Sequence, residues 1–140
     1  MSISEQFSDL TNADIADMDR QRAAVRGLAE EALGNAGTID FQTLKLLVDS
    51  NAVRLDDTWT LQALGVCFGD AVTRIAPVHW AIIEDEWGRD PTLLWENSKV
   101  NLNALTVLSK RIEAGERPDV QQLAEGLVKR GLELTEKHWR

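Results

Sequence analysis

The hydrophobic residues of this chain follow one pattern at its two ends and another in its middle. In five segments apolar residues recur at three- and four-residue steps, the spacing of one buried face of an α-helix. Those segments are residues 12–34, 40–49, 57–76, 103–115 and 118–137. Residues 78–102 instead combine branched and aromatic residues with turn formers, which is typical of short strands. The pattern predicts an α+β domain with N-terminal helices, a small antiparallel sheet of about three strands and two C-terminal helices.

Capping residues mark the ends of the predicted helices. Thr11 and Asp14 match a capping box, and Gly34 follows the last apolar residue of the first helix. Asp40 stands at the start of the second helix, and Asp56 and Asp57 stand at the start of the third, where a side-chain oxygen accepts from free backbone N–H groups. These residues predict where the first three helices begin and where the first one ends.

Two glycines inside the predicted third helix suggest close packing. Gly65 and Gly69 lie four residues apart, and each costs about 1 kcal/mol relative to Ala in an exposed helix interior. Two such costs predict that another element packs close to the backbone there. The buried faces are expected to include Ile15 in the first helix and Ile75 in the third.

The middle of the chain predicts a hairpin followed by a third short strand. Residues 78–87 form the expected first strand, the Gly-Arg-Asp-Pro run at 88–91 the turn, and residues 92–96 the return strand. Residues 99–102 are expected to add the third strand. Because neighbouring side chains alternate faces, Ile82 and Ile83 point to opposite sides, and the pattern leaves open which side is buried.

Composition narrows the classes of function. The 140 residues include 23 acidic and 15 basic side chains, for a net charge of −8, which argues against binding of nucleic acid. The first 19 residues contain no Lys or Arg, and no apolar run is long enough to span a bilayer. A single cysteine, Cys67, excludes an internal disulfide. We therefore expect one cytoplasmic domain without a membrane segment, and we identify no cofactor motif.

Residues 84–90 hold the one unusual cluster, with four carboxylates beside tryptophans. One interpretation is that these charges form the solvent-exposed end of a strand and protect its exposed edge against aggregation. A second is that Arg89 pairs with a neighbouring carboxylate while Asp90 holds the turn. A third is that Glu84 and Glu86, with the distant Asp70, hold a divalent metal through oxygen ligands. The first two together are favoured over the third.

The five tryptophans have different predicted roles. Core packing is expected for Trp59 and Trp80, whereas Trp87 near the turn is the best candidate for exposure and ligand binding. Trp139 is interpreted as a packing anchor or part of an interface. The candidate ligand-binding residues are therefore Trp80, Glu84, Glu86, Trp87, Arg89 and Asp90.

Three sequence blocks together resemble a bacterial family known as "domain of unknown function 3806". They are LQALGVCFGD at 61–70, HWAIIEDEWGRDP at 79–91 and SKRIEAGE at 109–116. The resemblance covers about residues 36–130 and leaves residues 1–34 as an N-terminal helical extension of a single domain, 1–140. It implies a small α+β domain without established activity, and that Lys110 and Arg111 reach the acidic strand.

The absence of catalytic motifs favours a non-enzymatic binding or protein-interaction module, with its surface near the hairpin. The alternative is a metal-dependent hydrolase that uses Asp70, Glu84 and Glu86. The expected partner is a protein or a small ligand, not nucleic acid or a membrane. A long amphipathic first helix also raises the hypothesis of a homodimer formed through that helix.

Overall fold

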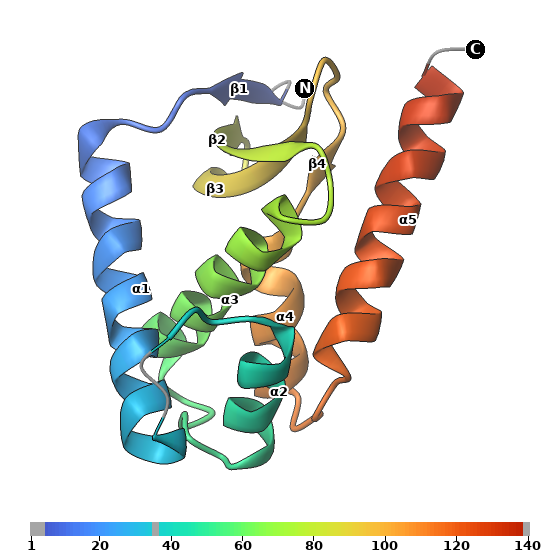
Figure 1. Cartoon of the computed structure of the whole chain (residues 1–140). Helices are drawn as coiled ribbons and strands as arrows, with labels where there is room; N and C mark the ends of the chain where they lie inside the picture. Colours follow the sequence, from blue (N-terminus) through green and yellow to red (C-terminus); the bar gives the residue numbers. More distant parts are fainter. Residues whose placement is uncertain (1–4, 35–36, 139–140) are drawn as a thin grey trace.

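Five helices and a four-stranded antiparallel sheet make up the fold (Figure 1). The computed structural model describes residues 5–34 and 37–138. In chain order the elements are β1 (Gln6–Ser8), α1 (Asn12–Leu33), α2 (Phe41–Asp49), α3 (Thr58–Thr73), β2 (Val78–Asp85), β3 (Gly88–Trp95), β4 (Asn101–Leu102), α4 (Ala104–Glu113) and α5 (Val120–His138). The α+β class predicted from the sequence is confirmed.

The predicted helix boundaries are confirmed by their capping interactions. Thr11 and Asp14 form a reciprocal capping box at the start of α1, and Gly34 ends that helix in the left-handed conformation, with φ 68°. Asp40 accepts from the backbone N–H of Thr43 at the start of α2. Asp57 caps α3 in the same way. These ends were predictable because each depends on residues within four positions of one another.

The sheet differs from the prediction in one strand and one turn. Its strand order is β1-β2-β3-β4, and β1, with three residues, is too short to show the alternation that identifies a strand. Asp85 pairs with Gly88, so the turn consists of residues 86–87, and the prediction of a turn at 88–91 is wrong. Pro91 lies within β3, opposite Ile82. It is tolerated because β4 pairs only with residues 93–94 of β3.

The face of β2 that carries Ile82 is turned toward the helices. Trp80 pairs with Leu93 and Val78 with Trp95, so these four side chains share a face, and they all contact the main hydrophobic core. Figure 1 shows the sheet at one end of the helical group, with α1 and α5 on opposite sides of α3. The sequence pattern left this orientation open, and the packing decides it, although Ala81 and Thr92 on the opposite face are also buried.

Helix α3 lies at the centre of the core, and its two glycines allow its neighbours to approach, as predicted. A Cβ atom added at Gly65 would lie 2.1 Å from the backbone oxygen of Leu105 in α4. One added at Gly69 would lie 2.3 Å from the indole ring of Trp80. Both distances are far below van der Waals contact, so only glycine fits at these two positions.

Some of the expected burial is wrong. Ile15 and Ile75 are exposed, and Trp59 is 50% exposed at the start of α3. Each of these residues lies in the first or last turn of its predicted helix, or just beyond it, where no other element covers the apolar stripe. Trp139 lies outside the described residues.

Helix α1 is part of the hydrophobic core. It buries Met18, Val25 and Ala29, and it packs along α3 and against α2. Self-association through α1 stays a prediction. Within the described residues no helix is long and apolar enough to cross a membrane.

The close approach at Gly65 leads to a stability prediction. Gly65→Ala should lower the free energy of unfolding by about 1–3 kcal/mol or more, because the new methyl group meets backbone rather than a side chain that can move. The measurement is chemical denaturation followed by circular dichroism.

The matched control is Gly27→Ala in α1, where an added Cβ meets nothing within 4 Å. This variant should be more stable by up to about 1 kcal/mol, since alanine favours the helix. Equal effects of the two substitutions would contradict the close packing of α4 on α3.

Candidate functional site

The tip of the β2–β3 hairpin carries most of the residues predicted for binding. Asp85 Oδ1 accepts from the backbone N–H of Trp87 at 2.8 Å, which closes the two-residue turn. Gly88 follows with φ 134°, a conformation that other residues rarely adopt. Trp87 itself is 87% exposed. The turn is held by Asp85, so the prediction that Asp90 holds it is wrong.

A bidentate ion pair ties the hairpin to the start of α1. Arg89 donates to the two carboxylate oxygens of Asp14 at 2.8 and 2.7 Å. Arg89 was expected to pair with a carboxylate beside it, but its partner lies 75 residues away in the sequence. The Arg89 guanidinium, together with the Thr11 backbone N–H, holds the pKa of Asp14 well below its ordinary range. Asp14 therefore caps α1 and anchors the hairpin at once.

The candidate residues fall into two groups in the structure. Glu84, Glu86, Trp87 and Asp90 are exposed at the tip, and none of the three carboxylates forms an ion pair with a described residue. Trp80 is half-buried against Gly69, as its predicted core role requires. It is thus a packing residue and lies apart from the exposed tip.

A pocket of about 390 Å³ lies beside the hairpin, and we call it the hairpin pocket. Its lining includes Trp87, three acidic residues and one lysine, together with neutral polar groups of β3, β4 and α4. The lining residues are Glu5, Ile83, Asp85, Trp87, Gly88, Asp90, Thr92, Asn101, Asn103, Thr106 and Lys110. Lys110 lines the same pocket as Asp85 and Asp90 of the hairpin, whereas Arg111 lies 3.7 Å from Glu116.

The carboxylates predicted to hold a metal are not brought together. Asp70 on α3 accepts from Arg22 at 2.7 and 2.9 Å and from the indole N–H of Trp80 at 2.9 Å. Glu84 and Glu86 lie at the hairpin tip. Within residues 5–34 and 37–138, no three His, Cys, Asp or Glu side chains are arranged to hold a metal ion. The carboxylate set of the hydrolase hypothesis is therefore not assembled.

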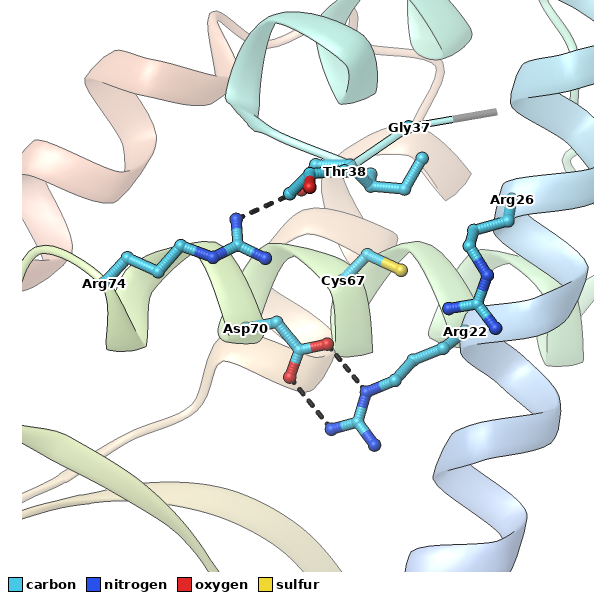
Figure 2. Close-up of a pocket in the computed structure, with 8 residues that line it drawn as sticks. Arg22, Arg26, Gly37, Thr38, Cys67, Asp70 and Arg74 are labelled. Carbon is cyan, nitrogen blue, oxygen red and sulfur yellow. Dashed lines mark hydrogen bonds and ion pairs between the residues drawn. The ribbon is translucent and has the colours of Figure 1, made fainter. Parts of the chain in front are cut away.

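A second pocket, which the sequence analysis missed, lies between α1, α3 and the segment before α2 (Figure 2). We call it the arginine pocket. It has a volume of about 460 Å³ and is lined by Arg22, Arg26, Gly37, Thr38, Ile39, Cys67, Asp70 and Arg74. The spacing of Arg22 and Arg26, and of Asp70 and Arg74, places each pair on one helix face. That spacing was visible in the sequence, but the convergence of the two faces was not.

Cys67 lines the arginine pocket as a buried, unreactive thiol. Burial, and secondarily the nearby charge of Asp70, raise the pKa of Cys67 to about 12. A thiol with that pKa carries almost no thiolate at neutral pH. The interpretation of Cys67 as a packing residue is supported.

The Arg89–Asp14 pair makes stability depend on pH. Because the pKa of Asp14 in the folded protein lies below its ordinary value of 3.8, the carboxylate stabilises the fold at neutral pH. That contribution is lost as the pH falls below about 4. Asp14→Asn, which keeps an acceptor for the helix cap, should therefore lower the melting temperature at pH 7. The difference from wild type should shrink between about pH 5 and pH 2.

Thermal denaturation monitored by circular dichroism across this pH range is the measurement. The control is Asp9→Asn, since Asp9 is exposed and pairs with no described residue. A difference that stays constant over the range, or an equal loss in the control, would refute the role assigned to the pair.

Comparison with known proteins gives a fold and a family. No curated protein matches the chain. A crystal structure of a protein from Bacteroides thetaiotaomicron VPI-5482 has a similar fold, with a TM-score of 0.77 and 12% sequence identity. The similarity covers 89% of this chain and 47% of that one, so this chain spans about half the length of that protein. The model of the family described as "Domain of unknown function (DUF3806)" matches residues 40–123, and the chain therefore belongs to that family.

Proposed function

We propose that this protein is a binding module that recognises a basic segment of a partner protein through the hairpin tip. The observation that carries the proposal is the 87% exposure of Trp87 in a two-residue turn that is closed by a hydrogen bond to Asp85. Tryptophan is the residue most enriched among those that dominate binding energy at protein interfaces. An exposed tryptophan side chain contributes no hydrophobic stabilisation to the fold, because it is not removed from water.

Intramolecular contacts hold the hairpin tip in place without a bound partner. Asp85 closes the turn, and the bidentate contact from Arg89 to Asp14 links β3 to α1. Strand β1 pairs along β2 up to Glu84, so the outer edge of β2 is covered nearly to the turn. A surface that is already ordered loses less conformational entropy on binding than a flexible loop does.

The charges around Trp87 indicate the chemistry of the partner. Glu84, Glu86 and Asp90 are exposed and form no ion pair with a described residue, although Glu84 lies opposite Arg89 and contributes to the raised pKa of that arginine after the larger effect of Asp14. Arg89 itself is paired with Asp14. The hairpin pocket beside them has three acidic side chains against one lysine. Lys or Arg side chains gain both Coulomb attraction to such carboxylates and a cation–π contact with an indole face.

The test compares two tryptophan variants. Binding of a synthetic peptide of Lys, Arg and Gly is measured by isothermal titration calorimetry, with a peptide of Glu and Gly as the charge control. Wild type should bind the basic peptide only. Trp87→Ala should weaken binding at least about tenfold, as expected for a residue that contributes 1.4 kcal/mol or more.

Trp59→Ala is the matched control, because Trp59 is a half-exposed tryptophan at the start of α3. It should bind like wild type. Pull-down from the native cell, followed by mass spectrometry, should then identify partners that Trp59→Ala retains and Trp87→Ala loses. Binding that is equal for the two variants, or absent for the basic peptide, would overturn the proposal.

A further inference from the structure

We infer that the arginine pocket is a binding site for a small organic dianion, such as a phosphate monoester. The pocket is separate from the hairpin tip, and the inference does not depend on the proposed function. It rests on three properties of the lining: two arginines that form no hydrogen bond with a described carboxylate, the two helices that bring them together and the apolar surface between them.

One arginine of the pocket is already neutralised. Arg22 donates from Nε and Nη2 to the two oxygens of Asp70, and from Nη1 to Asp19 at 2.9 Å. Asp70 is held in turn by the indole N–H of Trp80. These contacts hold the side chains of Arg22 and Asp70 in place on one side of the pocket, and they leave neither charge free for a ligand.

The two other arginines have no acidic hydrogen-bond partner. Arg26 forms no hydrogen bond or ion pair with any described residue. Arg74 donates from Nη1 to the backbone oxygen of Ile39 at 3.3 Å and forms no hydrogen bond or ion pair with a described carboxylate. Its charge adds to the hydrogen bonds from Thr43 in lowering the pKa of Asp40, a residue outside the pocket lining. Figure 2 shows the two side chains on opposite sides of Cys67, one from α1 and one from α3. The lining therefore carries a local charge of about +2 in a protein whose net charge is −8.

This arrangement favours an anion with two negative charges. Two cations that face one cavity repel each other, and an anion between them replaces that repulsion with attraction. The planar N–H donors of a guanidinium match the oxygens of phosphate and carboxylate groups. A phosphate monoester carries between one and a half and two negative charges at neutral pH, which matches the combined charge of Arg26 and Arg74.

The pocket has room for more than the charged group. Its volume of about 460 Å³ is in the range of small-molecule sites, about 300–1,000 Å³. Cys67 and Ile39 in its wall are only 3% and 7% exposed and present apolar surface, and Thr38 adds a hydroxyl at the rim. The expected ligand therefore has a dianionic group and a small uncharged body.

The test uses the full chain and calorimetric titration with glycerol 3-phosphate, inorganic phosphate, succinate, acetate and glycerol. Glycerol 3-phosphate should bind, succinate tests whether a dicarboxylate is accepted as well, and acetate and glycerol should bind at least about tenfold more weakly. Arg26→Gln and Arg74→Gln should each weaken binding by about tenfold or more.

The control is Arg20→Gln, which removes the same charge from α1 at a residue outside the pocket lining. It should bind like wild type. Without ligand, Arg26→Gln should melt no lower than wild type, because Arg26 forms no hydrogen bond or ion pair with a described residue. The inference is overturned if no dianion binds, if inorganic phosphate alone binds, or if Arg20→Gln weakens binding as much as the pocket variants do.

Discussion

The close approach of α4 and the sheet to α3, at Gly65 and Gly69, is the constraint on which the rest of the structure depends. A side chain at either position would overlap the Leu105 backbone or the Trp80 ring. Because Trp80 lies over Gly69, its indole N–H reaches Asp70, the next residue on the helix. Asp70 then holds Arg22 of α1. Because residue 69 is a glycine, Trp80 can approach α3 closely enough for these contacts to form. The contacts join α1, α3 and β2, and they also form one wall of the arginine pocket.

The second connection between α1 and the sheet lies at the other end of the hairpin. Arg89 and Asp14 join the tip to the first turn of α1, and Asp14 is at the same time the N3 residue of the capping box. Besides the chain connection from β1 into α1, side chains attach the sheet to α1 at two points, through Asp70 and through Asp14. Two attachments explain how a hairpin of two eight-residue strands presents Trp87 in a defined position.

The structural comparison places at least part of α1 within the fold shared with the solved structure. The family model matches residues 40–123, which excludes α1, and the sequence analysis interpreted residues 1–34 as an extension. The structural similarity covers 89% of the chain, which leaves about 15 residues unmatched, fewer than the 22 residues of α1. At least part of α1 therefore belongs to the shared fold, in agreement with the burial of Met18, Val25 and Ala29.

The sequence by itself determined the α+β class, the caps of the first three helices, the close packing at Gly65 and Gly69 and the exposure of Trp87. The caps and the spacing of the two glycines are patterns within a few positions, which helix propensity and periodicity reveal, although the residues that meet Gly65 and Gly69 are Leu105 and Trp80. Only the tertiary structure decided the partner of Arg89, the buried face of β2, the pairing of β1 and the arginine pocket. These features join residues such as Arg22 and Asp70, 48 positions apart, and Asp14 and Arg89, 75 positions apart. A local pattern shows which side chains share a helix face, but the packing of whole elements determines which faces meet.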